Sequence, residues 1–192
     1  MKPVHRLRAL LFDLDGTLID SAEASNAAYA RALLEFGVRI APDEVARAAA
    51  GRHWRDFLPE LLSRSGAVCD PAEVAQRKGE LYRENLDALR LNLALLSLAA
   101  SVGPEMQTVL VTTASGESVG AILRQFDLGR AFDLVVTGDE VTRHKPDPEA
   151  YLLALARLQL EPAKCLAFED SDVGVASARA AGIPVVRVTF TA

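Results

Sequence analysis

The chain has 192 residues, 50% of them apolar and 24% charged, which is the composition of a folded globular protein and not of a disordered one. Its formal net charge of -5 argues against a nucleic-acid or anionic-membrane surface, because both partners require a basic field. The two cysteines, Cys69 and Cys165, are far apart without CxxC spacing and predict neither a disulfide framework nor a zinc site. Without a signal-like or membrane-spanning stretch, we expect a cytoplasmic protein that binds neither nucleic acid nor membrane.

The first predicted element is a strand at residues 7–12, an apolar run interrupted only by Arg8. Such a run is typical of a strand buried on both faces of a parallel sheet. Residues 21–89 then show helical patterns and no convincing strand, with a first helix around residues 30–37 and others at 42–50, 54–65 and 71–89. We therefore predict a helical insert at residues 20–89 in a discontinuous core of residues 1–19 and 90–192.

Strands and helices alternate after the insert. Apolar runs predict strands at residues 108–113, 134–137, 165–168 and 184–188. Helices are expected at 118–126, at 147–160 with Asp147 as N-cap and Pro148 first, and at 172–181 before Gly182. The alternation predicts an α/β fold with a doubly wound, Rossmann-like parallel sheet.

Polar side chains follow the predicted strands. In open α/β sheets, ligands bind outside the carboxyl ends of the strands, so residues there are expected to converge. The residues in this position are Asp13, Asp15, Thr113, Lys145, Glu169 and Asp170. Phosphoryl transfer explains this set, because an ionised Asp13 carboxylate needs no base to attack phosphorus.

The remaining residues of the set fit supporting roles in that reaction. Glu169 and Asp170 are candidate ligands for Mg²⁺, which together with Lys145 would screen the repulsion between carboxylate and phosphate. Asp15 would protonate the leaving oxygen and later deprotonate water. Gly16 would let backbone amides face the phosphate.

Four motifs occur in order: FDLDGT at residues 12–17, VLVTT ending at Thr113, HKPDPEAY at 144–151 and FEDSDVGVASARAAG at 168–182. With them the sequence resembles the haloacid dehalogenase-like (HAD) hydrolase superfamily, in particular helical-cap phosphatases of the phosphoglycolate phosphatase and β-phosphoglucomutase-like subgroup. The resemblance implies that the helical insert is a cap over the active site.

The resemblance also implies roles for single residues. Asp13 would be the nucleophile, Asp15 the acid/base, and Thr113 and Lys145 phosphate ligands. Mg²⁺ would be bound by Asp13, Asp170 and the Asp15 carbonyl, with Glu169 in or beside that shell. Substrate-binding candidates are Gly16, Thr17 and Ala114 in the core, and Arg52, Trp54 and Arg55 in the cap segment GRHWR.

Several alternatives stay open at this point. Thr112 replaces Thr113 as the ligand if the strand register differs by one residue. The GRHWR segment is alternatively a solvated helix start. His5, His53 and His144 do not cluster in the sequence, and we expect surface or loop positions for all three. Cys165, in an apolar strand, is expected to be a packing residue.

The predicted function is a Mg²⁺-dependent phosphatase that hydrolyses a small phosphorylated metabolite through an aspartyl-phosphate on Asp13. One alternative is an intramolecular phosphomutase, although Ser25 stands where such mutases usually carry a histidine. A second alternative, from another class, is a catalytically silent phosphate-binding module. The intact set of Asp13, Asp15, Lys145 and Asp170 argues against it, because a pure binder needs no acid/base.

Overall fold

The computed structural model describes residues 6–190 and contains a sheet of five parallel strands in the order β5-β4-β1-β6-β7. The strands are β1 (Ala9–Phe12), β4 (Gln107–Val111), β5 (Leu134–Val136), β6 (Cys165–Glu169) and β7 (Val185–Arg187). Since β1 is central, the chain builds one side of the sheet with β4 and β5 and the other with β6 and β7. The predicted doubly wound α/β fold is confirmed.

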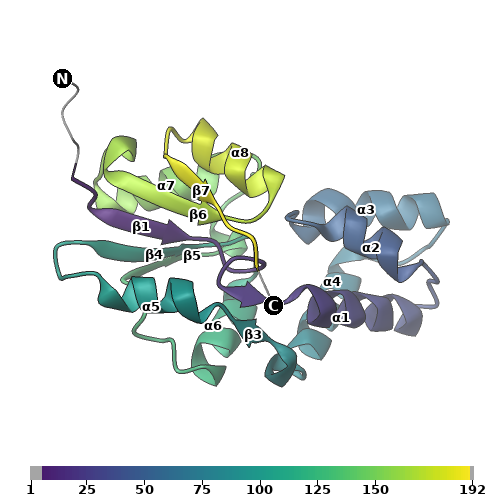
Figure 1. Ribbon diagram of the computed structural model, residues 1–192. Coiled ribbons are helices and arrows are strands. Elements are labelled where there is room, and N and C mark those ends of the chain that lie inside the picture. Colours follow the sequence, from purple (N-terminus) through teal and green to yellow (C-terminus); the bar gives the residue numbers. More distant parts are fainter. Residues whose placement is uncertain (1–5, 191–192) are drawn as a thin grey trace.

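Helices cover both faces of the sheet (Figure 1). On one face, Leu10 and Phe12 of β1 pack with residues of α5 (Leu93–Ser101) and α6 (Gly116–Gln125). On the other, Ala9 and Leu11 pack with residues of α7 (Glu149–Leu158) and α8 (Asp172–Ala180). Successive side chains of a strand point to opposite faces, which explains why β1 is apolar throughout.

The helical insert forms a separate lobe at the carboxyl ends of the strands (Figure 1). It consists of α1 (Ala22–Glu35), α2 (Pro42–Ala49), α3 (Trp54–Ser65), α4 (Pro71–Arg83) and the short 3-10 helix η1 (Leu86–Ala88). We call this lobe the cap and the rest of the chain the core.

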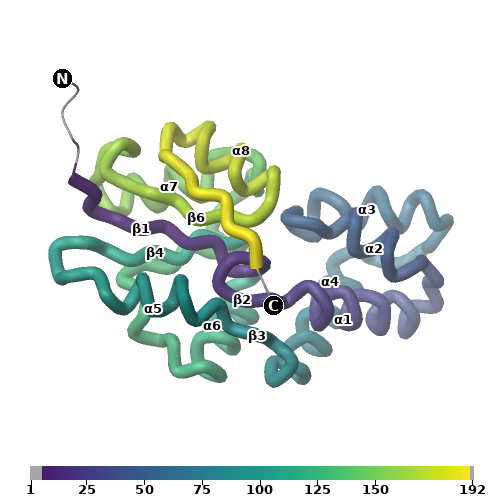
Figure 2. Tube along the Cα trace, viewed as in Figure 1, coloured from purple at the N-terminus to yellow at the C-terminus, as the bar shows by residue number. Residues whose placement is uncertain are grey.

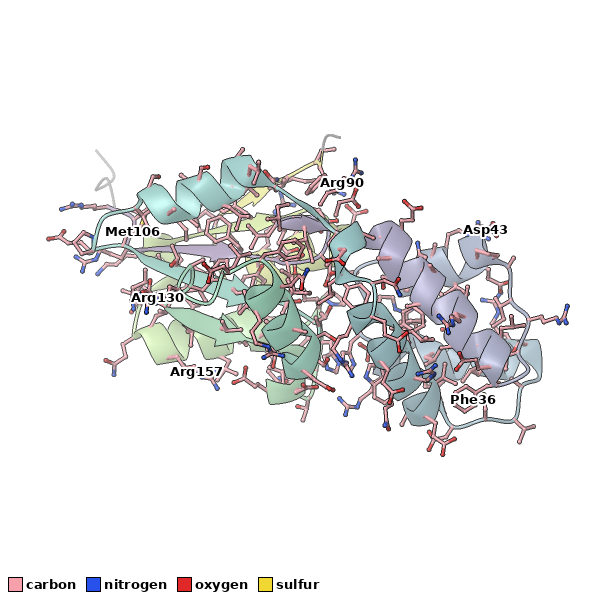
Figure 3. The ribbon with its side chains drawn as sticks, turned by 90° about the horizontal axis from the view of Figure 1, so that it is seen from below. Phe36, Asp43, Arg90, Met106, Arg130 and Arg157 are labelled. Atoms are coloured by element: carbon pink, nitrogen blue, oxygen red, sulfur yellow. The ribbon has the colours of Figure 1, made fainter. Side chains whose placement is uncertain are left out.

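A two-stranded antiparallel ribbon joins cap and core, formed by β2 (Ile19–Asp20) and β3 (Arg90–Leu91) (Figure 2). Figure 3 shows Arg90 at this junction, whereas Phe36 and Asp43 lie in the cap away from it. The assignment of residues 20–89 to a separate domain stays a prediction, and the ribbon is the structural feature found at those boundaries.

The structure departs from the predicted elements at several places. Helix α5 was not predicted, because its sequence LALLSLAAS is apolar throughout and lacks a helical period of polar residues. The helix expected at 71–89 ends at Arg83. Helix α7 starts at Glu149 with Pro148 in the N-cap position, although the Asp147 carboxylate still accepts the Glu149 amide at 3.0 Å. The short 3-10 helices η2 (Gly138–Glu140) and η3 (Pro162–Lys164) were not predicted either.

Within residues 6–190, no helix combines the length and the apolar character needed to cross a membrane.

Candidate active site

The predicted catalytic residues meet at the carboxyl end of β1. Asp13 follows β1 directly, and its amide donates to the Phe168 carbonyl of β6 at 3.0 Å. The ammonium of Lys145, from the loop before α7, lies 2.7 Å from Asp13 Oδ1 and 2.5 Å from Glu169 Oε1. It also donates to the Val111 carbonyl of β4 at 3.0 Å. Three neighbouring strands and one loop thus contribute to a single hydrogen-bonded group.

Lys145 stays charged although it is only 3% exposed. Burial by itself lowers the pKa of its ammonium, but the charges of Asp13 and Glu169 outweigh burial and raise this pKa above its ordinary value. The site therefore keeps a fixed positive charge beside the predicted nucleophile at neutral pH.

Glu169 is fully buried behind Lys145. Its Oε1 also accepts from the Tyr151 hydroxyl at 2.5 Å, whereas its Oε2 has no hydrogen-bond partner among residues 6–190. Burial, with the nearby charge of Asp13, raises the pKa of Glu169 to about 7 against the opposing effect of Lys145. A Cβ on Gly174 would lie 1.9 Å from Oε2, so only glycine leaves room for this carboxylate.

Three carboxylates form a group of oxygen donors that suits a divalent cation. Asp13, Glu169 and Asp170 each offer one oxygen, and these oxygens all lie within 4.8 Å of one another. Burial and the charge of Asp13 raise the pKa of Asp170 to about 6, as expected for crowded carboxylates. Hard oxygen donors and an unpartnered carboxylate oxygen fit Mg²⁺, the predicted ion. The Asp15 side chain is outside this group, which leaves its carbonyl for the predicted metal contact.

Asp15 instead accepts a hydrogen bond from the Ser21 hydroxyl, at 2.5 Å. Burial raises the pKa of Asp15, and the charge of Asp13 adds to this effect, while the Ser21 hydrogen bond opposes it. A raised pKa favours the protonated form that a general acid needs. Gly16, next to Asp15, is favoured for two reasons. Its φ of +82° suits glycine, and a Cβ at this position would lie 2.1 Å from Asp170 Oδ2.

A cleft of about 710 Å³ lies between cap and core above these residues. Most of the predicted site residues line it, namely Asp13, Asp15, Gly16, Arg52, Trp54, Arg55, Thr113, Ala114, Lys145 and Asp170. Thr17 and Glu169 do not: both are completely buried. A second cleft, of about 480 Å³, lies on the cap and contains none of the predicted catalytic residues.

The structure distinguishes the two alternatives for neighbouring threonines. Thr112 is 1% exposed, and its hydroxyl accepts the Ala114 amide at 3.0 Å, whereas Thr113 lines the cleft. Thr113 is therefore the residue of the pair that faces the site.

The GRHWR segment lies both at the start of a helix and beside the cleft, and a substrate-binding role for it stays a prediction. It contains the start of α3 at Trp54, and Arg52, Trp54 and Arg55 also line the cleft. The Arg55 guanidinium lies 4.8 Å from the centre of the Trp54 ring, a cation–π contact.

Lys78 of α4 is a site residue that the sequence analysis missed. It lines the cleft, and its ammonium lies 4.8 Å and 4.5 Å from the ring centres of Tyr29 and Tyr82. Burial lowers its pKa to about 8, against the opposing charge of Asp15. The sequence offered one signal for this contact: Tyr82 follows Lys78 by four residues, and residues four apart lie on the same face of a helix.

His53 and His144 were expected at surface or loop positions, and the surface expectation is wrong. Both lie in loops, but they are only 3% and 6% exposed. Their rings stack on each other with centres 3.7 Å apart, His53 from the cap and His144 from the core. The sequence contains no signal for this contact, because it depends on how the two lobes meet. The third histidine, His5, lies outside the described residues.

Comparisons with known proteins agree with this geometry. The family described as haloacid dehalogenase-like hydrolase matches residues 10–188. The fructose-1-phosphate phosphatase YqaB of Escherichia coli strain K12 is 30% identical over 184 residues, covering 96% of this chain and 97% of its own. The phosphorylated carbohydrates phosphatase of Thermotoga maritima is 33% identical, covering 92% and 82%.

A solved structure shows the same architecture. CbbY from Rhodobacter sphaeroides, determined in complex with phosphate, has a TM-score of 0.85 and 26% identity, covering 96% of this chain and 87% of its own. The family and the fold expected from the four motifs are thus confirmed, while the roles of single residues stay predictions. The chain belongs to the haloacid dehalogenase-like hydrolase family.

Proposed function

We propose that this protein is a Mg²⁺-dependent phosphatase that hydrolyses a small sugar phosphate through an aspartyl-phosphate on Asp13. That it is a phosphatase follows from its family and from the phosphatases among its relatives. The observation that carries the finer proposal is the contact of Asp13 with the buried Lys145, beside the carboxylates of Glu169 and Asp170. We also propose a cytoplasmic location, to which the two free cysteines are suited.

In the first step, an Asp13 carboxylate oxygen attacks phosphorus and the bond from phosphorus to the ester oxygen breaks. Asp15 gives its proton to the departing alcohol oxygen. Lys145 stabilises the negative charge on the transferring group, since its ammonium already touches Asp13. Thr113, which lines the same cleft, binds the phosphate in this proposal.

In the second step, Asp15 takes a proton from water, the water oxygen attacks phosphorus, and the bond from phosphorus to Asp13 breaks. Phosphate leaves, and both aspartates return to their starting protonation states. General acid and base catalysis by Asp15 contributes roughly 10²- to 10⁴-fold. When bound by Asp13, Asp170 and the Asp15 carbonyl, with Glu169 in or beside the shell, Mg²⁺ supplies positive charge that offsets the repulsion between carboxylate and phosphate.

The walls of the cleft support a sugar as the alcohol part of the substrate. Ser25, Asn26 and Gln76 of the cap line it with neutral groups that hydrogen-bond to hydroxyls. Lys78, over the buried rings of Tyr29 and Tyr82, adds a further hydrogen-bond donor. The named substrates of the two relatives, fructose 1-phosphate and phosphorylated carbohydrates, belong to this class.

The test is phosphate release from a panel of sugar phosphates, with and without Mg²⁺. Wild type is expected to release phosphate only with Mg²⁺, and Asp13→Asn to be inactive, because the amide cannot attack phosphorus. The matched control is Asp127→Asn, at an exposed position with φ +52°, where asparagine is as well tolerated as aspartate.

Two outcomes would contradict the proposal. Substantial Mg²⁺-dependent release by Asp13→Asn would reject the nucleophile. Conversion of the sugar phosphate into an isomeric sugar phosphate, without release of phosphate, would favour the phosphomutase alternative. Stoichiometric binding of the sugar phosphate without turnover would favour the silent binding module.

A further inference from the structure

The loop between α2 and α3 contacts the core at a place that the proposed reaction does not use. His53, at the end of this loop, stacks on His144 with ring centres 3.7 Å apart and an angle of 12° between the rings. His144 directly precedes Lys145, and its Nε2 lies 3.2 Å from the Gly138 carbonyl, which ties the ring to the core. The contact therefore joins the cap to the segment that carries the catalytic lysine.

Two further contacts show that the cap is closed over the core in this structure. Gly51 has φ +65°, and a Cβ there would lie 2.5 Å from Val173 Cγ2 of α8. On another wall of the cleft, Arg83 of α4 forms an ion pair with Glu117 of α6 at 2.9 Å. Figure 1 shows the end of the cap at the α2–α3 loop beside α8.

The histidine pair is unsuited to a shared metal ion. His53, His144 and Asp56 each offer a ligand atom, and these atoms lie within 4.8 Å of one another. An imidazole nitrogen binds a metal in the plane of its ring, at about 2.0 Å. Two nearly parallel rings stacked 3.7 Å apart cannot both direct their lone pairs at one ion. The arrangement is that of a packing contact between two faces.

We propose that His53 is a positioning residue: by stacking on His144 it holds the cap closed over the loop that carries Lys145. The ring of His53 has two duties, since its Nδ1 also accepts the Arg55 amide at 3.3 Å as the N-cap of α3. The stacking contact uses the face of the ring and the helix cap uses its Nδ1, so the two duties are separable by substitution. As far as catalysis is concerned, this inference rests on the proposed function.

Closure by this contact depends on pH. The charged groups that act on His53 are Arg55 of α3 and His144 of the core. Asp56 of α3 lies 3.3 Å from His144 Nδ1, and Asp139, beside Gly138, lines the same cleft. Burial, followed by the charges of His144 and Arg55, lowers the pKa of His53 to about 3 in the closed protein. An opened cap returns the ring to water and to a pKa near 6.5, so protonation favours the open form. Below about pH 6.5, closure weakens roughly tenfold per pH unit.

The first experiment measures the contact without any enzymatic activity, by NMR of the histidine ring protons in the substrate-free protein. At about pH 7.5 we expect the His53 signals to be shifted upfield by the neighbouring ring, and to lose this shift on acidification as protonation opens the cap. In His144→Ala the upfield shift should disappear. A His53 ring that lacks the upfield shift at about pH 7.5 overturns the proposal, whatever the enzyme does.

The second experiment compares two substitutions of His53. Asparagine retains an N-cap acceptor for α3 but has no ring, whereas phenylalanine retains the ring but not the acceptor. For fructose 1-phosphate, kcat/KM should fall roughly 3- to 10-fold in His53→Asn, mainly through KM, and recover in His53→Phe. Methyl phosphate, which is too small to need the cap, should be affected less than about twofold. Arg64→Gln, an exposed change at the other end of α3, is the control.

The pH dependence completes the test. As pH falls below about 6.5, wild-type kcat/KM for fructose 1-phosphate, divided by that for methyl phosphate, should fall over the same pH range in which the His53 ring loses its upfield shift, and in His53→Phe this ratio should stay constant. Equal losses on both esters, or no recovery with phenylalanine, contradict the positioning role. A wild type that hydrolyses no sugar phosphate of the panel, while showing the upfield-shifted His53 ring at about pH 7.5, refutes the proposed function but not the closure contact.

Discussion

The Lys145 ammonium lies between the carboxylates of Asp13 and Glu169, and all three groups are buried. In the proposed reaction its two roles are therefore linked: it would provide charge for phosphoryl transfer, and it balances the charge of Glu169. Glu169 is enclosed by Tyr151 and Gly174, and its carboxylate is completely buried, so water does not solvate its charge. A buried ion pair of this kind costs more to break on one side than to remove altogether.

Replacing Lys145 by methionine should reduce turnover by at least about 100-fold, because the charge next to the transferring group is lost. It should also lower the free energy of unfolding by roughly 3 kcal/mol, since Glu169 is left without its partner. The double variant Lys145→Met/Glu169→Gln should regain most of the stability but none of the activity. Urea unfolding measures the effect on stability, and phosphate release measures the effect on turnover. If Lys145→Met alone were as stable as wild type, Lys145 would not be balancing the charge of Glu169.

Asn92 connects three segments at the junction between cap and core. Its backbone amide donates to the Leu18 carbonyl at 2.8 Å. Its side chain makes two more hydrogen bonds: Nδ2 donates to the Thr17 carbonyl at 3.0 Å, and Oδ1 accepts from the Leu95 backbone amide at 3.2 Å. It is thus the N-cap of α5 and a clamp on the turn that follows Asp15 and Gly16. With the ribbon of β2 and β3, it supports the hinge on which the cap is mounted.

Asn92→Ala should lower the free energy of unfolding by about 2 kcal/mol, because both the cap of α5 and the bond to the buried Thr17 carbonyl are lost. Asn92→Ser retains a helix cap but cannot reach Thr17, and should recover about 1 kcal/mol of that loss. Urea unfolding of the three proteins checks this. Equal stability of the alanine and serine variants would show that the cap of α5 contributes nothing.

At the scale of the whole molecule, several acidic side chains lie close together at the carboxyl edge of the sheet, beneath the cap. The carboxylates of Asp13, Asp15 and Asp170 come from the ends of two adjacent strands, β1 and β6. Burial and the charge of Asp13 raise the pKa of Asp15 and that of Asp170. A raised carboxyl pKa means that the folded state holds a proton that the unfolded chain releases. For Asp170, the stability it contributes is complete below about pH 3.8 and is lost as pH rises through about 6.

Asp170→Asn should therefore be more stable than wild type at about pH 7.5 without Mg²⁺, and equal to it near pH 4. Excess Mg²⁺ should raise the melting temperature of wild type at about pH 7.5 and leave that of the variant nearly unchanged, since a ligand is missing. Melting curves at both pH values, with and without the ion, test this. A variant that Mg²⁺ stabilises as much as wild type would argue against Asp170 as a ligand.

Much of this protein follows from local sequence. The apolar runs located the five strands of the sheet, because a strand buried on both faces needs apolar residues throughout, as β1 shows. Once the sheet was known to be parallel, Asp13, Lys145 and Asp170 had to converge, since the carboxyl ends of parallel strands share one edge. Helix α3 was predicted at its observed bounds, Trp54–Ser65, from its amphipathic pattern.

Other features were decided only by tertiary structure. The strands of the hinge, two residues each, are too short for any periodic pattern, and α5 is apolar on every side. The stacking of His53 on His144 and the position of Lys78 over the site depend on how the cap is oriented, which no local pattern encodes. The sequence by itself determined the sheet and the chemistry at its edge, because both arise from residues within single elements. The cap's contribution was decided by contacts between segments far apart in the chain.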